Sequence, residues 1–163
     1  MLIKHNVKNR ADYTRNFYDD GKLRDIDISR ADIEDLIDKK EVWRTIQWLC
    51  KHVHHECARF DYINYAIATK IAKRVLTGEE KKMVEEKSKG LFKMKERELL
   101  SYKTYEALKK YVFKCWKEFE TYNMVTFTKV KYNKTFGRGR RRRTYTYTET
   151  AIKLTEKGKN VNV

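Results

Sequence analysis

The chain has 163 residues, of which 40% are hydrophobic and 37% are charged, a length and composition typical of one domain or of one domain with an appendage. This composition excludes a disordered chain, and the three cysteines argue against a disulfide framework. The first eleven residues lack the apolar core of a secretory signal, and no apolar run reaches the length of a membrane span. We therefore expect a cytoplasmic protein with no membrane partner.

The positive charge is concentrated in the last third of the chain. The formal net charge is +15, yet residues 1–50 hold 10 Lys/Arg and 10 Asp/Glu, and residues 51–100 hold 12 and 8. Residues 101–163 hold 16 Lys/Arg against 5 Asp/Glu. Such an asymmetry indicates one end that faces a polyanion.

The absence of proline, with many lysines, tyrosines and asparagines, indicates an A/T-rich genome such as that of a virus or a thermophile. We expect a nucleoid-associated protein, or one of the host cytoplasm if the source is a virus.

The N-terminal part predicts an arm followed by helices. Residues 1–28 have little apolar periodicity, although Lys22–Ile28 is compatible with a short strand. Ser29 with Asp32 predicts the N-terminus of a short helix that extends through Ile37. A longer helix is expected over residues 41–60. Its apolar positions alternate spacings of three and four, which predicts a seam that faces a partner. These positions are Trp43, Ile46, Cys50, Val53, Cys57 and Phe60. We therefore expect a possible homodimer through the Trp43–Phe60 helix.

The C-terminal part predicts three more helices and two strands. A helix is expected over Asp61–Val75, and Thr77 with Glu80 forms a capping-box pair before a polar stretch that Gly90 ends. Leu91–Leu100 predicts a short helix, Ser101–Thr104 a polar break, and Thr104–Thr121 an amphipathic helix. Asn123 follows where a left-handed residue is wanted. Met124–Tyr132 and Arg143–Leu154 predict strands, with a bend at Gly137–Gly139 between them.

This order of elements resembles the winged helix-turn-helix superfamily of archaeal, bacterial or viral regulators, over roughly residues 61–159. Trp116-Lys-Glu-Phe119 followed by Tyr122-Asn-Met-Val125 is similar to that family's passage from recognition helix to wing strand. Leu154-Thr-Glu-Lys-Gly158-Lys is similar to the segment that closes the wing. The turn at Ser101–Thr104 departs from the pattern because it lacks a glycine, and the N-terminal half has no counterpart. The resemblance implies a mainly helical α+β fold, with residues 1–60 as arm and helical extension and residues 61–163 as the nucleic-acid-binding domain.

The basic side chains predict contact with phosphate. Five of the six residues from Arg138 to Arg143 are arginine, and guanidinium groups are always charged and fork onto phosphate. The expected helix over Thr104–Thr121 adds a row of lysines on its polar side, and residues at its start are candidates for base contact. The predicted nucleic-acid-binding residues are Tyr102, Lys103, Thr104, Lys110, Lys114, Lys117, Lys129, Lys131, Lys134, Arg138, Arg140, Arg141, Arg142 and Arg143. We expect a protein that binds double-stranded DNA, as a transcriptional regulator or architectural factor.

Alternative interpretations remain open from the sequence. Basic winged helices also bind structured RNA, and others serve as protein-interaction adaptors. The lysine row of the expected helix and the arginine run are also compatible with ordinary solvated surfaces. A metal site could use Cys50, His54 and Cys57 on one helical face with Cys115, but free cysteines on apolar stripes usually pack as small hydrophobes. No phosphate-binding loop or nucleophile motif occurs, so we expect neither an enzyme nor a cofactor.

Overall fold

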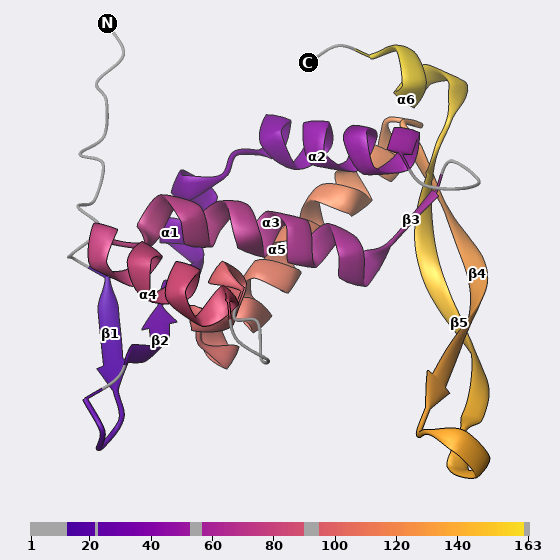
Figure 1. Cartoon of the computed structure of the whole chain (residues 1–163). Coiled ribbons are helices and arrows are strands. Elements are labelled where there is room, and N and C mark those ends of the chain that lie inside the picture. Colours follow the sequence, from indigo (N-terminus) through magenta and orange to yellow (C-terminus); the bar gives the residue numbers. More distant parts are fainter. Residues whose placement is uncertain (1–12, 22, 53–56, 90–94, 162–163) are drawn as a thin grey trace, which may run out of the picture. The chain divides into compact units, whose positions relative to one another are not determined.

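The computed structural model describes residues 13–21, 23–52, 57–89 and 95–161. In these ranges the chain has six α-helices, two short 3-10 helices and two antiparallel sheets, which is an α+β fold (Figure 1). The chain divides into two compact units. Unit 1 comprises residues 1–39 and 65–113, and unit 2 comprises residues 40–64 and 114–163. Helices α3 (Phe60–Val75) and α5 (Tyr102–Thr121) contribute residues to both units.

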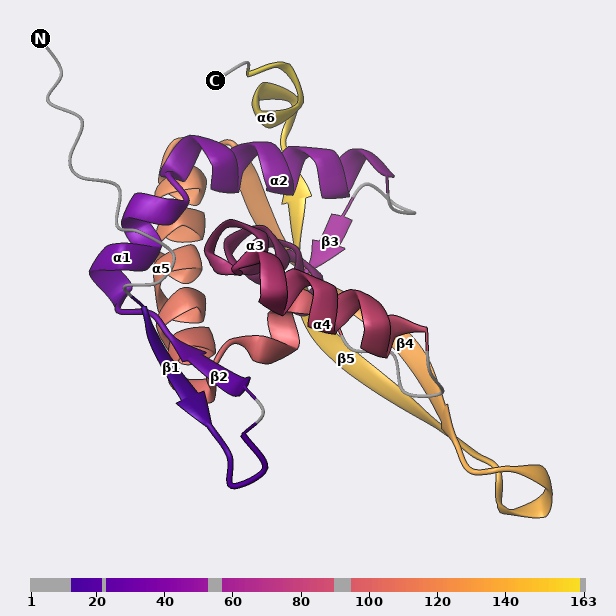
Figure 2. The ribbon, with the colours of Figure 1, turned by 60° about the vertical axis from the view of Figure 1, so that its left-hand side comes forward.

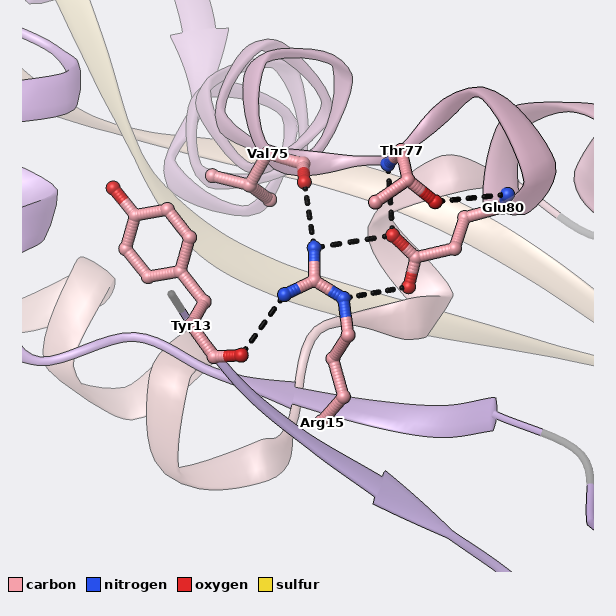
Figure 3. Close-up of polar contacts among 5 residues, drawn as sticks. All are labelled: Tyr13, Arg15, Val75, Thr77 and Glu80. Carbon is pink, nitrogen blue, oxygen red and sulfur yellow. Dashed lines mark hydrogen bonds and ion pairs between the residues drawn. The ribbon is translucent and has the colours of Figure 1, made fainter. Parts of the chain in front are cut away.

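Unit 1 begins with a β-hairpin. An ion pair between Arg15 and Glu80, largely shielded from water, links this hairpin to the segment Val75–Glu80. Strands β1 (Thr14–Phe17) and β2 (Leu23–Asp27) are antiparallel. Arg15 donates from Nε to Glu80 Oε2 at 3.0 Å and from one terminal nitrogen to the Val75 carbonyl at 3.0 Å (Figure 3). Glu80 in turn accepts from the Thr77 backbone N–H at 2.8 Å. The capping box predicted from Thr77 and Glu80 is confirmed, and its carboxylate also holds the hairpin.

Side-chain caps start helices at three points of unit 1, at Ser29, Thr77 and Ser101. In α1 (Arg30–Leu36) the Ser29 hydroxyl accepts from the Asp32 N–H, as the sequence predicts. Helix α4 spans Gly78–Ser88, and the 3-10 helix η3 spans Glu96–Leu99. At the start of α5 the Ser101 hydroxyl accepts from the Thr104 N–H at 3.1 Å. The predicted break at Ser101–Thr104 is therefore an N-cap and the first helical turn, which explains why it needs no glycine.

The core of unit 1 is built mainly of branched aliphatic side chains from β2 and from the helices. Burial of such side chains stabilises a fold by about 1.5–3 kcal/mol each. The buried polar residues of unit 1 include Thr104, whose hydroxyl donates to the Ile26 carbonyl and accepts from the Ile28 N–H at 2.8 Å. The fully buried side chains include Ile26, Ile33, Ile37, Ile67, Ile71, Leu76, Leu99 and Leu108.

Unit 2 contains a three-stranded sheet in the order β3-β5-β4. Strand β3 (Cys57–Arg59) pairs only with Ala151–Lys153 of β5 (Arg143–Leu154). Strand β4 (Val125–Phe136) pairs with β5 along its whole length, and we call these two strands the ribbon (Figures 1 and 2). The predicted bounds of β5 are confirmed, and Asn123 has the predicted left-handed conformation with φ 58°. Helix α6 (Glu156–Asn160) follows, with Thr155 as its N-cap.

The core of unit 2 is aromatic. The Trp43 ring of α2 (Lys39–His52) meets the Phe119 ring at 5.0 Å between centroids, and Phe60 lies 4.0 Å from Trp116. Trp43, Ile46 and Cys50 are all buried in this unit. These three residues of the predicted seam therefore pack inside their own unit, Val53 lies outside the described residues, and the packing gives no support to the predicted homodimer through the Trp43–Phe60 helix.

Three expectations need correction. Helix α2 ends at His52, and Cys57 belongs to β3, so the predicted helix over residues 41–60 is too long. Residues 14–17 form β1 within the stretch that was predicted to be an arm. A helix was predicted over Leu91–Leu100. Residues 91–94 lie outside the described residues, and the rest of this segment contains only the short 3-10 helix η3. Helices α3 and α5 otherwise occupy the expected segments.

Candidate nucleic-acid interface

The candidate site is the outer part of the ribbon. Because β3 covers only Ala151–Lys153, the ribbon is two-stranded from the Lys129–Thr150 pair to the Phe136–Arg143 pair. Gly137 and Gly139 make the bend with φ 86° and 59°, values that few residues with a side chain adopt. A Cβ on Gly137 would lie 2.5 Å from the Arg141 carbonyl oxygen, so this tip requires glycine.

The tip carries the five predicted arginines, and all of them are exposed. Arg140 and Arg141 form the 3-10 turn η4 (Gly139–Arg141), and Arg138, Arg142 and Arg143 flank it. The 28 residues between Glu120 and Glu149 contain eight Lys/Arg and no Asp/Glu. With no carboxylate in this stretch to neutralise them, these cations create a positive potential around the ribbon.

One face of the ribbon, which we call the lysine face, comprises Lys129, Lys131, Asn133 and Thr135 with the threonines opposite them. Its polar groups pair across the strands: Lys129 Nζ donates to Thr150 Oγ1 at 2.8 Å, and Thr146 Oγ1 donates to Asn133 Oδ1 at 2.9 Å. The Thr135 and Thr144 hydroxyls lie 3.0 Å apart. At the base of this face, Lys117 Nζ of α5 lies 5.1 Å from the ring centroid of Phe127.

The opposite face, which we call the ring face, comprises the pairs Tyr132–Tyr147, Lys134–Tyr145 and Phe136–Arg143. The Tyr132 and Tyr147 rings stack at 5.6 Å with 24° between their planes, and Phe136 lies 5.8 Å from Tyr145. Phe136 is 49% exposed and Tyr145 is 48% exposed. The strand pattern of residues 143–154 was visible in the sequence, but the ring face was not predicted because it depends on the register between two strands.

Charged groups gather where the ring face meets the three-stranded part of the sheet. The Arg59 guanidinium lies 4.1 Å from the Tyr62 ring centroid and 4.0 Å from that of Tyr132. It also lies 3.5 Å from Glu149 Oε2. Burial and a hydrogen bond with Asp61 raise the pKa of Glu149, whereas Arg59 acts in the opposite direction. Burial also raises the pKa of Tyr132, with Glu149 adding to the effect.

The predicted residues of α5 fall in different places. Lys114 and Lys117 belong to unit 2, as the ribbon does, whereas Lys103 and Lys110 are exposed lysines of unit 1. Tyr102, also of unit 1, is 79% exposed. Thr104 is only 1% exposed and uses its hydroxyl inside unit 1, so it cannot reach a base edge, contrary to expectation.

The possible metal ligands do not form a site in the described residues. Cys57 lies in β3 and not on the helical face of Cys50, and His54 falls outside the described residues. Burial raises the pKa of the Cys50 thiol to about 12, which opposes the thiolate that a metal requires. The Cys50 thiol instead faces the Ile152 carbonyl at 3.5 Å, and Cys115 is buried. Over the described ranges, no cluster of three or more His, Cys, Asp or Glu could hold a metal ion.

Comparison of this chain with protein-family models, with curated proteins and with solved structures finds no match. None of the helices that the structure describes is both long and apolar enough to cross a membrane.

Proposed function

We propose that this protein binds DNA through the ribbon and acts without catalysis, as a regulator of transcription or an architectural factor. The observation that carries the proposal is the exposed tip, where five arginines lie on a hairpin within a 28-residue stretch free of carboxylates. Arginine is weakly hydrated and binds phosphate through a planar fork, and arginines on narrow projections fit a DNA minor groove. Double-stranded DNA offers both a groove of suitable width and a dense row of phosphates.

The proposal includes a winged-helix mode of binding. Helix α5 leads through Asn123 directly into β4, the arginine tip and β5, which is the chain order that the sequence resemblance implies. Within unit 2, the contact of Lys117 with Phe127 supports a continuation of the lysine face onto the end of α5. In this arrangement Lys114 and Lys117 add phosphate contacts to those of Lys129 and Lys131.

Binding titrations across salt concentrations test the proposal. A footprint that neutralises about six to ten phosphates lowers the affinity for duplex DNA by roughly 10³–10⁵ between 50 and 200 mM salt. Replacement of both Arg140 and Arg141 by alanine should weaken binding and reduce the salt slope by about two, since each lost phosphate contact contributes about one. The matched control is the double variant Lys81→Ala/Lys82→Ala, which removes two exposed cations from α4.

The outcomes separate the competing interpretations. An unchanged salt slope in the Arg140→Ala/Arg141→Ala variant would remove the ribbon from the proposed function. A Lys114→Ala/Lys117→Ala variant tests the contribution of α5, and an unchanged slope there would leave the ribbon as the interface without a winged-helix mode. Preferential competition by duplex RNA of the same length would replace DNA with RNA as the ligand.

A further inference from the structure

The two faces of the ribbon offer different chemistry. On the lysine face, the hydroxyl, amide and ammonium groups bond to one another across the strands in three of the four pairs, Lys129–Thr150, Asn133–Thr146 and Thr135–Thr144. On the ring face, four aromatic rings follow one another along the strands, and two cations lie beside them. These six residues are Tyr132, Tyr147, Lys134, Tyr145, Phe136 and Arg143.

The rings of the ring face keep much of their surface open to solvent. Phe136, Tyr145 and Tyr147 are 49%, 48% and 39% exposed. Cross-strand aromatic pairs stabilise a two-stranded ribbon, but β-branched residues would do the same with less apolar surface in water. Open rings next to Lys134 and Arg143, in a stretch with no carboxylate, fit a ligand that combines flat apolar groups with negative charge.

We infer that the ring face binds a single-stranded nucleic-acid segment, with unpaired bases stacked on Phe136 and Tyr145 and phosphates held by the neighbouring cations. Aromatic platforms inside positively charged grooves bind single strands in this way, and the stacking tolerates any base sequence. The inference rests on the proposed function and extends it, because the ribbon would then bind DNA where the strands are separated as well as duplex. The positive charge of the ribbon favours a polyanion, and the exposed rings favour a polyanion that carries flat unpaired bases.

A comparison of three ligands tests the inference without any variant. These are a fluorescein-labelled 20-nucleotide oligothymidylate, an abasic strand with the same number of phosphates, and a 20-base-pair duplex. Stacking of one or more bases should make the oligothymidylate bind at least about 5-fold more tightly than the abasic strand. Equal affinity for these two strands would overturn the inference, and retained duplex binding would leave the proposed function intact. Binding to none of the three would reject both.

A pair of variants locates the effect on the ring face. The variant Phe136→Ile/Tyr145→Ile keeps β-forming side chains but removes two rings. The control Thr135→Val/Thr144→Val changes the adjacent pair on the lysine face. We expect the first variant to lose the preference for oligothymidylate over the abasic strand while its duplex affinity stays within about 2-fold, and we expect the control to keep the preference for oligothymidylate. Should the rings instead join two copies of the chain, the isoleucine variant would change the sedimentation of the protein and not its oligothymidylate affinity, which would overturn the inference.

Discussion

Arg15 and Glu80 lie 65 positions apart in the sequence, yet their side chains form an ion pair with 3.0 Å between Nε and Oε2. Both side chains are largely shielded from water, and each has a further backbone partner in unit 1 (Figure 3). Glu80 thus caps α4 and fixes β1 with the same carboxylate. Removal of one member of such a pair leaves the other charge poorly solvated, which costs more than the pair itself contributes.

We expect Glu80→Ala to lower the free energy of unfolding by about 2–3 kcal/mol, less than the roughly 3–5 kcal/mol of a fully buried pair because some solvent contact remains. Glu80→Gln should have an intermediate effect, since an amide oxygen can still accept from the Thr77 N–H. The exposed neighbour gives the control: Glu79→Ala should change the value by no more than about 0.5 kcal/mol. Urea denaturation measures all three. Equal effects of Glu79→Ala and Glu80→Ala would contradict the assigned role of the ion pair.

Thr104 provides a test that separates a structural role from a binding role. Thr104→Val keeps the shape of the side chain but leaves the buried Ile28 N–H without its acceptor, so we expect a loss of about 1–3 kcal/mol in stability. The affinity for duplex DNA should not change. Thr121→Val is the matched control in the same helix, because the Thr121 hydroxyl is exposed and donates only to the Lys117 carbonyl. A weaker affinity for DNA with unchanged stability would restore Thr104 as a contact residue.

Local signals explain how much of the fold the sequence predicted. The caps at Ser29 and Thr77 and the glycines at 137 and 139 act over three or four residues, so their patterns are readable in isolation. The alternation in residues 143–154 predicted β5 with its observed bounds for the same reason. The arginine tip followed from these elements, since a basic run between two strands can only occupy the bend.

Long-range pairing explains what the sequence did not predict. Strand β3 has three residues, and it exists because Cys57–Arg59 meets Ala151–Lys153 some 94 positions later. The seven-residue spacing between Cys50 and Cys57 fits a helix, but Cys57 lies in a strand, so this spacing led to a wrong helix prediction. The packing partner of the Trp43 face could not be predicted either, because periodicity shows that a helix face is buried and not which element covers it. The ring face required the register of Tyr132 with Tyr147, which no single strand reveals.

Gly158 is required by a close approach of backbone to backbone. A Cβ at this position would lie 2.0 Å from the Met124 carbonyl oxygen and 3.3 Å from the Trp43 ring. We expect Gly158→Ala to reduce the free energy of unfolding by about 1–3 kcal/mol, since α6 must shift away from the sheet. Gly78→Ala is the control, because no atom lies within 4 Å of the added Cβ and alanine favours the helix. Thermal denaturation should show a lower Tm for the first variant only, and equal Tm values would refute the close approach.

Glu149 is a carboxyl group whose neighbours favour its protonated form. Burial and Asp61 raise its pKa above the ordinary value, and the Arg59 guanidinium only partly offsets them. The folded protein therefore holds this proton at pH values where the unfolded chain has released it. By linkage, the contribution of Glu149 to stability is fully present below the unfolded pKa of about 4.5 and is lost as the pH rises through the folded pKa.

We expect Glu149→Gln to remove this loss, because an amide keeps a hydrogen-bonding group beside Asp61 without a second negative charge. The variant should match the wild type near pH 4 and should become the more stable of the two as the pH rises to 7. Urea denaturation at several pH values measures this difference, and the exposed Glu156→Gln serves as the control. Carboxyl groups with lowered pKa, such as Asp27 and Glu106, act in the opposite direction but are common to both proteins and cancel in the comparison. A difference that shrinks with rising pH would mean that the ion pair with Arg59 outweighs burial and Asp61.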